Sequence, residues 1–110
     1  MLKETVERIE RAIERIDATD SRNKAELIRL LAALKSEVSQ LSKTNQEQAR
    51  SIAGFAELAA HEATRKEKSP RLLKNALKGL SLSVEGFETS HTKLTQIING
   101  VCLALARIGI

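Results

Sequence analysis

Charged side chains are most concentrated between residues 65 and 78, where a run of basic residues is interrupted by a single acid, Glu67. Such a density of cations attracts anions, and nucleic acid, lipid headgroups or an acidic protein would all fit. The run also fits a solvated turn that keeps an apolar hairpin soluble. No aromatic side chain that could stack on a base lies within it. The predicted anion-binding patch comprises Arg65, Lys66, Lys68, Arg71, Lys74 and Lys78.

The histidines and the cysteine are the next candidates for chemistry. Glu57 and His61 are four residues apart, which places them on one helix face at a spacing that can bind a metal. A closed zinc site needs four ligands, and the remaining histidine, His91, is far along the chain. Cys102 stands alone in the apolar run 101–106, which is typical of a small buried hydrophobe. We therefore predict neither a metal ion nor a cofactor.

No arrangement of residues indicates catalysis. Glu62 beside His61 could transfer protons, but no nucleophile and no oxyanion donors accompany the pair. The sequence also contains no glycine-rich phosphate loop and no H-E-x-x-H motif. We predict that the protein is not an enzyme and that it has no catalytic residues.

Composition indicates one all-α domain over residues 1–110. The chain has 110 residues, 42% of them hydrophobic but only 2% aromatic, so its core must be aliphatic. One proline and five glycines argue against a turn-rich β fold. No apolar run approaches the ~20 residues that a membrane span needs, and no secretory signal is visible. We expect a cytoplasmic protein.

Apolar residues recur at alternating spacings of four and three, which predicts amphipathic helices. The pattern indicates helices at about residues 2–19, 23–66 and 70–108. Its rhythm continues through polar residues near the middle of the second and third helices. A break at residues 42–44 and another at residues 90–92 remain open, because Thr44 and Thr92 could each cap a new helix.

Short connections predict that the two long helices form an antiparallel hairpin, with the first helix packed on one end. In that register Leu31 lies opposite Leu105, and the polar residues Asn45 and His91 meet. We predict a polar core layer of Asn45, Gln48 and His91 that fixes the register. The layer could alternatively act as a pH-responsive site, because histidine titrates near neutral pH.

The middle of the hairpin is apolar around more than one stripe, which is typical of a helix that buries two faces. We therefore predict that two chains pack their hairpins into a four-helix bundle, with a tetramer as the alternative. The predicted dimer interface comprises Ile52, Phe55, Ala56, Ala59, Ala60, Leu73, Leu77, Leu80 and Val84.

The segments 51–65 and 86–110 resemble a family of small bacterial proteins known only as a domain of unknown function. The marks of this family are a Phe-Glu-x-Ser-His-Pro-x-Leu segment and a Gly-Ile ending. Residues 87–94 match the first mark except at Thr92, which replaces the proline, and the chain ends in Gly109-Ile110. The resemblance implies a helical fold and a bacterial origin, and it assigns no residue a role.

These observations favour a non-enzymatic helical scaffold that self-associates through its apolar hairpin. The alternative is a small nucleic-acid-associated protein that uses the cations of residues 65–78.

Overall fold

The computed structural model describes residues 2–16 and 21–109, and within these ranges it contains helices and no strand. The helices are α1 (Leu2–Glu14), α2 (Ser21–Thr44), α3 (Gln46–Thr64), α4 (Pro70–Ser83) and α5 (Thr92–Gly109). The predicted all-α helical bundle is confirmed.

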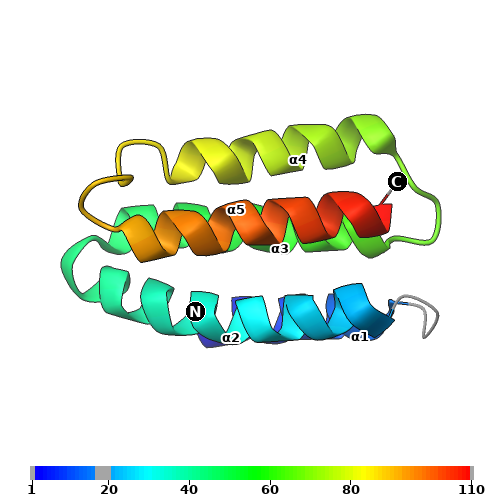
Figure 1. Cartoon of the computed structure of the whole chain (residues 1–110), viewed down its shortest axis with the longest axis horizontal. Helices are drawn as coiled ribbons and strands as arrows, with labels where there is room; N and C mark the ends of the chain where they lie inside the picture. Colours follow the sequence, from blue (N-terminus) through cyan, green and yellow to red (C-terminus); the bar gives the residue numbers. More distant parts are fainter. Residues whose placement is uncertain (1, 17–20, 110) are drawn as a thin grey trace.

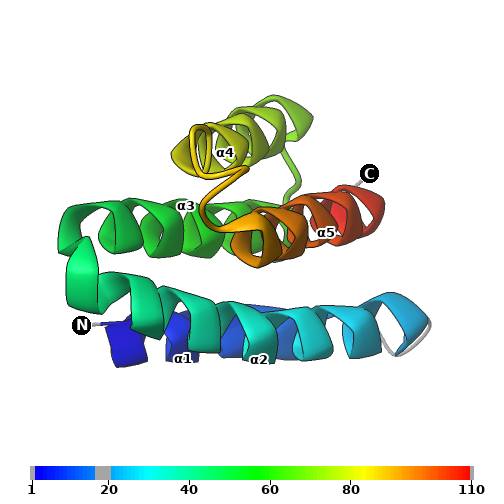
Figure 2. The same ribbon diagram turned by 60° about the vertical axis from the view of Figure 1, so that its left-hand side comes forward.

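The helices stack in three layers (Figure 1). Helices α1 and α2 form one layer, α3 and α5 form the second, and α4 lies alone on the far side of the second. The view turned by 60° shows the same three layers, with α3 and α5 between α4 and the pair α1 and α2 (Figure 2). Helix α3 packs against each of the other described helices, which makes it the centre of the bundle. One long side of α4 consequently faces away from the rest of the chain.

The core between the layers is aliphatic, as the composition predicts. Leu80, Leu94 and Ile98 are completely buried, and the side of α3 that faces inward is built largely from alanine. Small side chains on the central helix let its neighbours approach closely. Leu31 of α2 and Leu105 of α5 line the same small internal cavity, so the predicted antiparallel pairing of these two segments is confirmed.

The prediction of one helix over residues 23–66 is wrong. Helix α2 ends at Thr44, α3 begins at Gln46, and the two fold back on each other. Asn45 has non-helical backbone angles (φ −147°, ψ 75°), and its side-chain oxygen accepts a hydrogen bond from the amide of Gln48 at 3.4 Å. Asparagine is a favoured N-cap because its oxygen satisfies an amide that the new helix leaves unpaired. The break therefore lies one residue beyond the predicted alternative at residues 42–44.

The prediction of one helix over residues 70–108 is also wrong. Helix α4 ends at Ser83, and Gly86 follows with φ +95°, a conformation that side chains with a Cβ rarely adopt. The Glu88 carboxylate accepts a hydrogen bond from the Gly86 amide at 2.8 Å and holds the turn. Helix α5 then begins at Thr92, inside the predicted alternative at residues 90–92.

The first helix is shorter than the predicted range of 2–19. Helix α1 ends at Glu14, and the amides of Arg15 and Ile16 donate to carbonyls three residues earlier, which tightens the final turn. Residues 17–19 lie outside the described ranges. The helix packs mainly on α2 and α3, which both lie within the predicted second helix. The prediction placed it against the predicted third helix as well.

Most residues of the predicted dimer interface are covered within one chain, so they offer no surface to a second copy that packs on the folded chain. Ile52, Ala59 and Leu80 have no exposed surface at all. The break at Asn45 lets α1, α2 and α5 cover the inward face of α3, so the wide apolar sector needs no second chain. Leu77 is half-buried and Phe55 is partly exposed, and the buried members are Ile52, Ala56, Ala59, Ala60, Leu73, Leu80 and Val84.

Candidate anion-binding surface

Helix α4 presents a row of cations to solvent. The helix begins as the sequence predicts, because the Ser69 hydroxyl accepts a hydrogen bond from the Leu72 amide at 3.4 Å and Pro70 occupies the first turn. Arg71, Lys74 and Lys78 follow at spacings of three and four, which places them on one face, and all three are exposed. They span about 10 Å along the helix axis at 1.5 Å per residue.

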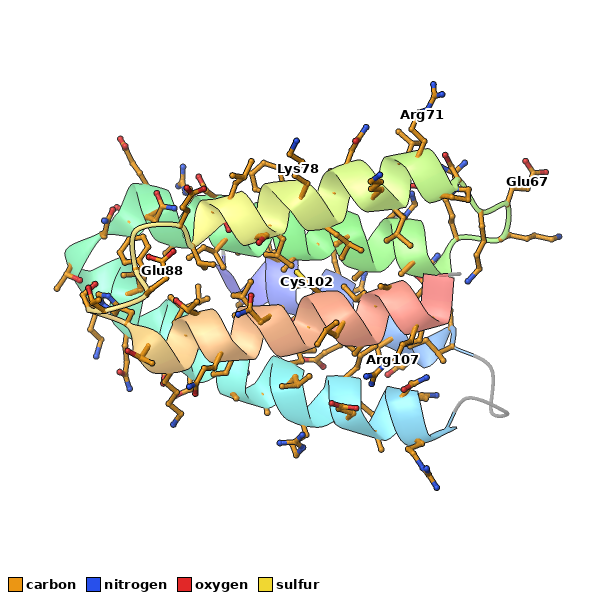
Figure 3. All side chains as sticks on the ribbon, turned by 45° about the horizontal axis from the view of Figure 1, so that its top comes forward. Glu67, Arg71, Lys78, Glu88, Cys102 and Arg107 are labelled. Atoms are coloured by element: carbon orange, nitrogen blue, oxygen red, sulfur yellow. The ribbon has the colours of Figure 1, made fainter. Side chains whose placement is uncertain are left out.

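This row, together with Lys66 just before the helix, is called the α4 ridge below. Figure 3 shows Arg71 and Lys78 pointing outward from the free side of α4. Helix α4 contains no Asp or Glu, and among the described residues no carboxylate forms an ion pair with a member of the ridge. The positive charge of the ridge is therefore not neutralised by the protein's own side chains.

Two members of the predicted patch have structural roles instead. The Lys68 ammonium donates to the carbonyl of Ala63 at 2.8 Å and to that of Ile108 at 3.1 Å, so it satisfies the carboxyl ends of both α3 and α5. Arg65 pairs with the buried carboxylate of Glu62 at 2.9 Å. The cations available to a ligand are consequently Lys66, Arg71, Lys74 and Lys78.

Replacing Lys68 by Met should lower the free energy of unfolding by about 1 kcal/mol, because two helix-terminal carbonyls lose their charged donor. Methionine keeps the length and the apolar stem of the side chain. Chemical denaturation measures the change, and Lys66→Met is the control because Lys66 makes no such bond in the described structure. Equal stabilities of the two variants would contradict the assigned role.

The predicted polar core layer is wrong. Asn45 is exposed at the turn between α2 and α3, and His91 is half-buried at the start of α5. His91 packs edge-on against Phe87, with ring centroids 5.2 Å apart, and its Nδ1 lies 3.0 Å from the Ser90 hydroxyl. Gln48 is half-buried and donates to the carbonyl of Ser83. The side chains of Asn45 and Gln48 thus satisfy helix ends, whereas that of His91 packs within the turn before α5. Both turns lie at the same end of the bundle (Figure 1).

A second group of basic residues, which the sequence reasoning missed, lines a groove between α1 and α3. The groove has a volume of about 750 Å³, and its lining includes Arg8, Arg11, Arg15 and His61. Arg8 pairs with Glu57 at 3.2 Å. Arg8 and Arg11 of α1 and Arg15 just after it follow at spacings of three and four, which is a signal that the sequence contains, but only the packing of α1 on α3 adds the histidine. Glu57 and His61, which have a spacing that can bind a metal, thus both line this groove, and the Glu57 carboxylate there pairs with Arg8.

The remaining reactive groups are unsuited to the chemistry considered from the sequence. Within the described residues no three side chains of His, Cys, Asp or Glu lie together as metal ligands would. Cys102 is half-buried with its sulfur 3.9 Å from the Leu77 carbonyl, and burial raises the pKa of the thiol. A raised pKa leaves less thiolate near neutral pH and so lowers nucleophilicity.

The domain of unknown function DUF4404 matches residues 27–110 of the chain. The chain belongs to this family. The family resemblance noted from the sequence is thereby confirmed, and it covers α3, α4, α5 and most of α2. No curated protein and no solved structure matches the chain. None of the described DUF4404 helices combines the length and apolarity that crossing a membrane requires.

Proposed function

We propose that the chain is a non-enzymatic interaction protein that binds nucleic acid through the α4 ridge. The observation that carries the proposal is the row of exposed cations on a helix without acids, on the free side of the outermost layer. A phosphate backbone is a linear array of anions, and each contact with Lys or Arg releases a condensed counterion. A straight helix edge suits such an array because it can approach without rearrangement.

The binding would not depend on base sequence. The side chains beside the ridge are Leu72, Asn75 and Leu82, and α4 itself contains no aromatic residue. The aromatic ring next to α4 is that of Phe55, which lies against Gly79, and a single ring offers no row of stacking platforms. Contacts to phosphate position a protein but carry no sequence information. The proposed activity is consequently weak, salt-sensitive attachment to a nucleic-acid backbone.

We expect the affinity for a short labelled DNA duplex to fall steeply with salt. If all four members of the ridge contact phosphates, the slope of log K against log salt concentration is about −3.6, at ~ −0.9 per phosphate. Replacing Arg71, Lys74 and Lys78 by Glu should reduce that slope to about −0.9 and weaken binding to all sequences alike. Fluorescence anisotropy at several salt concentrations measures both quantities.

The matched control replaces Arg29, Lys35 and Lys43 of α2 by Glu. These residues are exposed, and both triple replacements lower the net charge equally. An equal loss of binding in both variants would show that only net charge matters and would contradict binding at the α4 ridge. If the wild type binds vesicles of anionic lipid but neither DNA nor RNA, the proposal is wrong and the ligand of the ridge is a membrane surface.

A further inference from the structure

The turn between α2 and α3 consists of one residue, Asn45. Helical hydrogen bonding continues up to it and resumes from it. The Asn45 amide donates to the Leu41 carbonyl at 2.7 Å, and the Asn45 carbonyl accepts from the Ala49 amide at 3.1 Å. Both bonds join residues four apart, as in an α-helix. The bent chain therefore differs from a straight helix mainly in the backbone angles of this one residue.

Straightening the turn would not lose hydrogen bonds. In a continuous helix the amides of Gln46, Glu47 and Gln48 would donate to the carbonyls four residues before them. In the bent chain the Gln48 amide has the Asn45 side chain as its acceptor, at the long distance of 3.4 Å. A side-chain cap is thus exchanged for regular backbone bonds.

The apolar pattern also continues across the turn. Val38 and Leu41 of α2 and Ile52 of α3 are buried, and they fall in a single register of spacings of four and three through residues 45 and 48. A straight helix over residues 21–64 would present these side chains on one stripe. The sequence is consequently compatible with both the bent and the straight form.

A straight helix would uncover the surface between two units of the fold, the α1–α2 unit and the α3–α5 unit. In the bent chain α1 packs on α3, and α2 packs on α3 and α5, through the aliphatic core. A single chain could not leave so much apolar surface in water. A second copy in the same straight form offers the complementary surface, because each of its units is identical.

We propose that two copies of the chain exchange their α1–α2 units by straightening at Asn45. In the exchanged dimer every contact between the units is one that already exists within a chain, now made between chains. Short connections between long elements favour this kind of exchange. The dimer would place two α4 ridges on one particle, although the exchange does not depend on the binding proposed above.

Among the described residues, three ion pairs join the two units and would become contacts between chains. They are Arg8 with Glu57 at 3.2 Å, Glu37 with Lys93 at 3.7 Å and Glu26 with Arg107 at 4.0 Å. Contacts inside the α3–α5 unit, such as those of Lys68 with Ala63 and Ile108, would be kept. A cross-link between the two positions of such a pair therefore joins different chains only if the units have been exchanged.

Asn45→Ala and Asn45→Gly form a matched test. Alanine removes the cap and favours a helix, whereas glycine is tolerated as a cap and disfavours a helix interior. We expect the dimerisation constant of Asn45→Ala to exceed that of Asn45→Gly by at least about tenfold, because residue 45 becomes helical in both chains of each exchanged dimer. Sedimentation equilibrium measures both constants. If Asn45→Ala is monomeric up to its solubility limit, the proposal is wrong.

Cross-linking distinguishes the exchanged dimer from two bent chains that merely touch. In a Cys102→Ser background, one chain carries Glu37→Cys and another carries Lys93→Cys, with Asn45→Ala in both. The chains are mixed, unfolded and refolded together, and treated with a short bismaleimide. Exchange predicts a covalent heterodimer on a denaturing gel. A dimer in solution that yields no such product would overturn the proposal, since the two positions would then lie too far apart between chains.

Discussion

Ala56→Glu should prevent the chain from folding. Ala56 is 2% exposed and lines an internal cavity together with Leu34 of α2 and Val101 of α5. A carboxylate placed there loses its hydration and has no cation within the cavity lining to replace it. The cost is several kcal/mol, and the whole stability of a small domain is about 5–15 kcal/mol. Far-UV circular dichroism should show the loss of helix at neutral pH.

Ala32→Glu is the control for this change. It makes the same substitution at an exposed position of α2, where the carboxylate stays hydrated, so the folded structure should be kept. The sequence pattern alone assigns Ala56 to a dimer interface, and that assignment expects Ala56→Glu to yield a folded monomer. A folded, monomeric Ala56→Glu chain would therefore favour the interface over the intrachain core described here.

Leu80→Ala should lower the free energy of unfolding by about 2–5 kcal/mol. Leu80 is completely buried where α4 packs on α3 and α5, so the shorter side chain leaves a cavity as well as losing apolar burial. Chemical denaturation monitored by circular dichroism measures the change, and the transition midpoint should shift with little change in its slope.

Leu82→Ala provides an internal comparison on the same helix. Leu82 is 54% exposed, and the substitution alters helix propensity as much as Leu80→Ala does. We expect a change within about 0.5 kcal/mol. A large destabilisation by Leu82→Ala would mean that another surface covers the exposed side of α4, and the α4 ridge would then be unavailable to nucleic acid.

Much of the candidate site could be read from the sequence. Ser69 and Pro70 mark the start of a helix, and the spacing of Arg71, Lys74 and Lys78 places them on one face of it. These signals are local, because capping and helical periodicity depend on residues a few positions apart. The sequence could not show that Lys68 and Arg65, unlike the other cations of the patch, have structural roles. Their partners, the Ile108 carbonyl and the buried Glu62, are recognised only once the helices are packed.

The sequence by itself determined that the chain is helical, which side of each helix is apolar and that α2 meets α5 with Leu31 near Leu105. It did not determine where the long apolar pattern bends. A bend at Asn45 preserves the pattern and costs few hydrogen bonds, so local signals barely distinguish bent from straight. The tertiary structure decided it, because folding back buries the alanine-rich face of α3 within one chain. Burial of apolar surface depends on segments distant in sequence, and no periodicity records which of them will supply the cover.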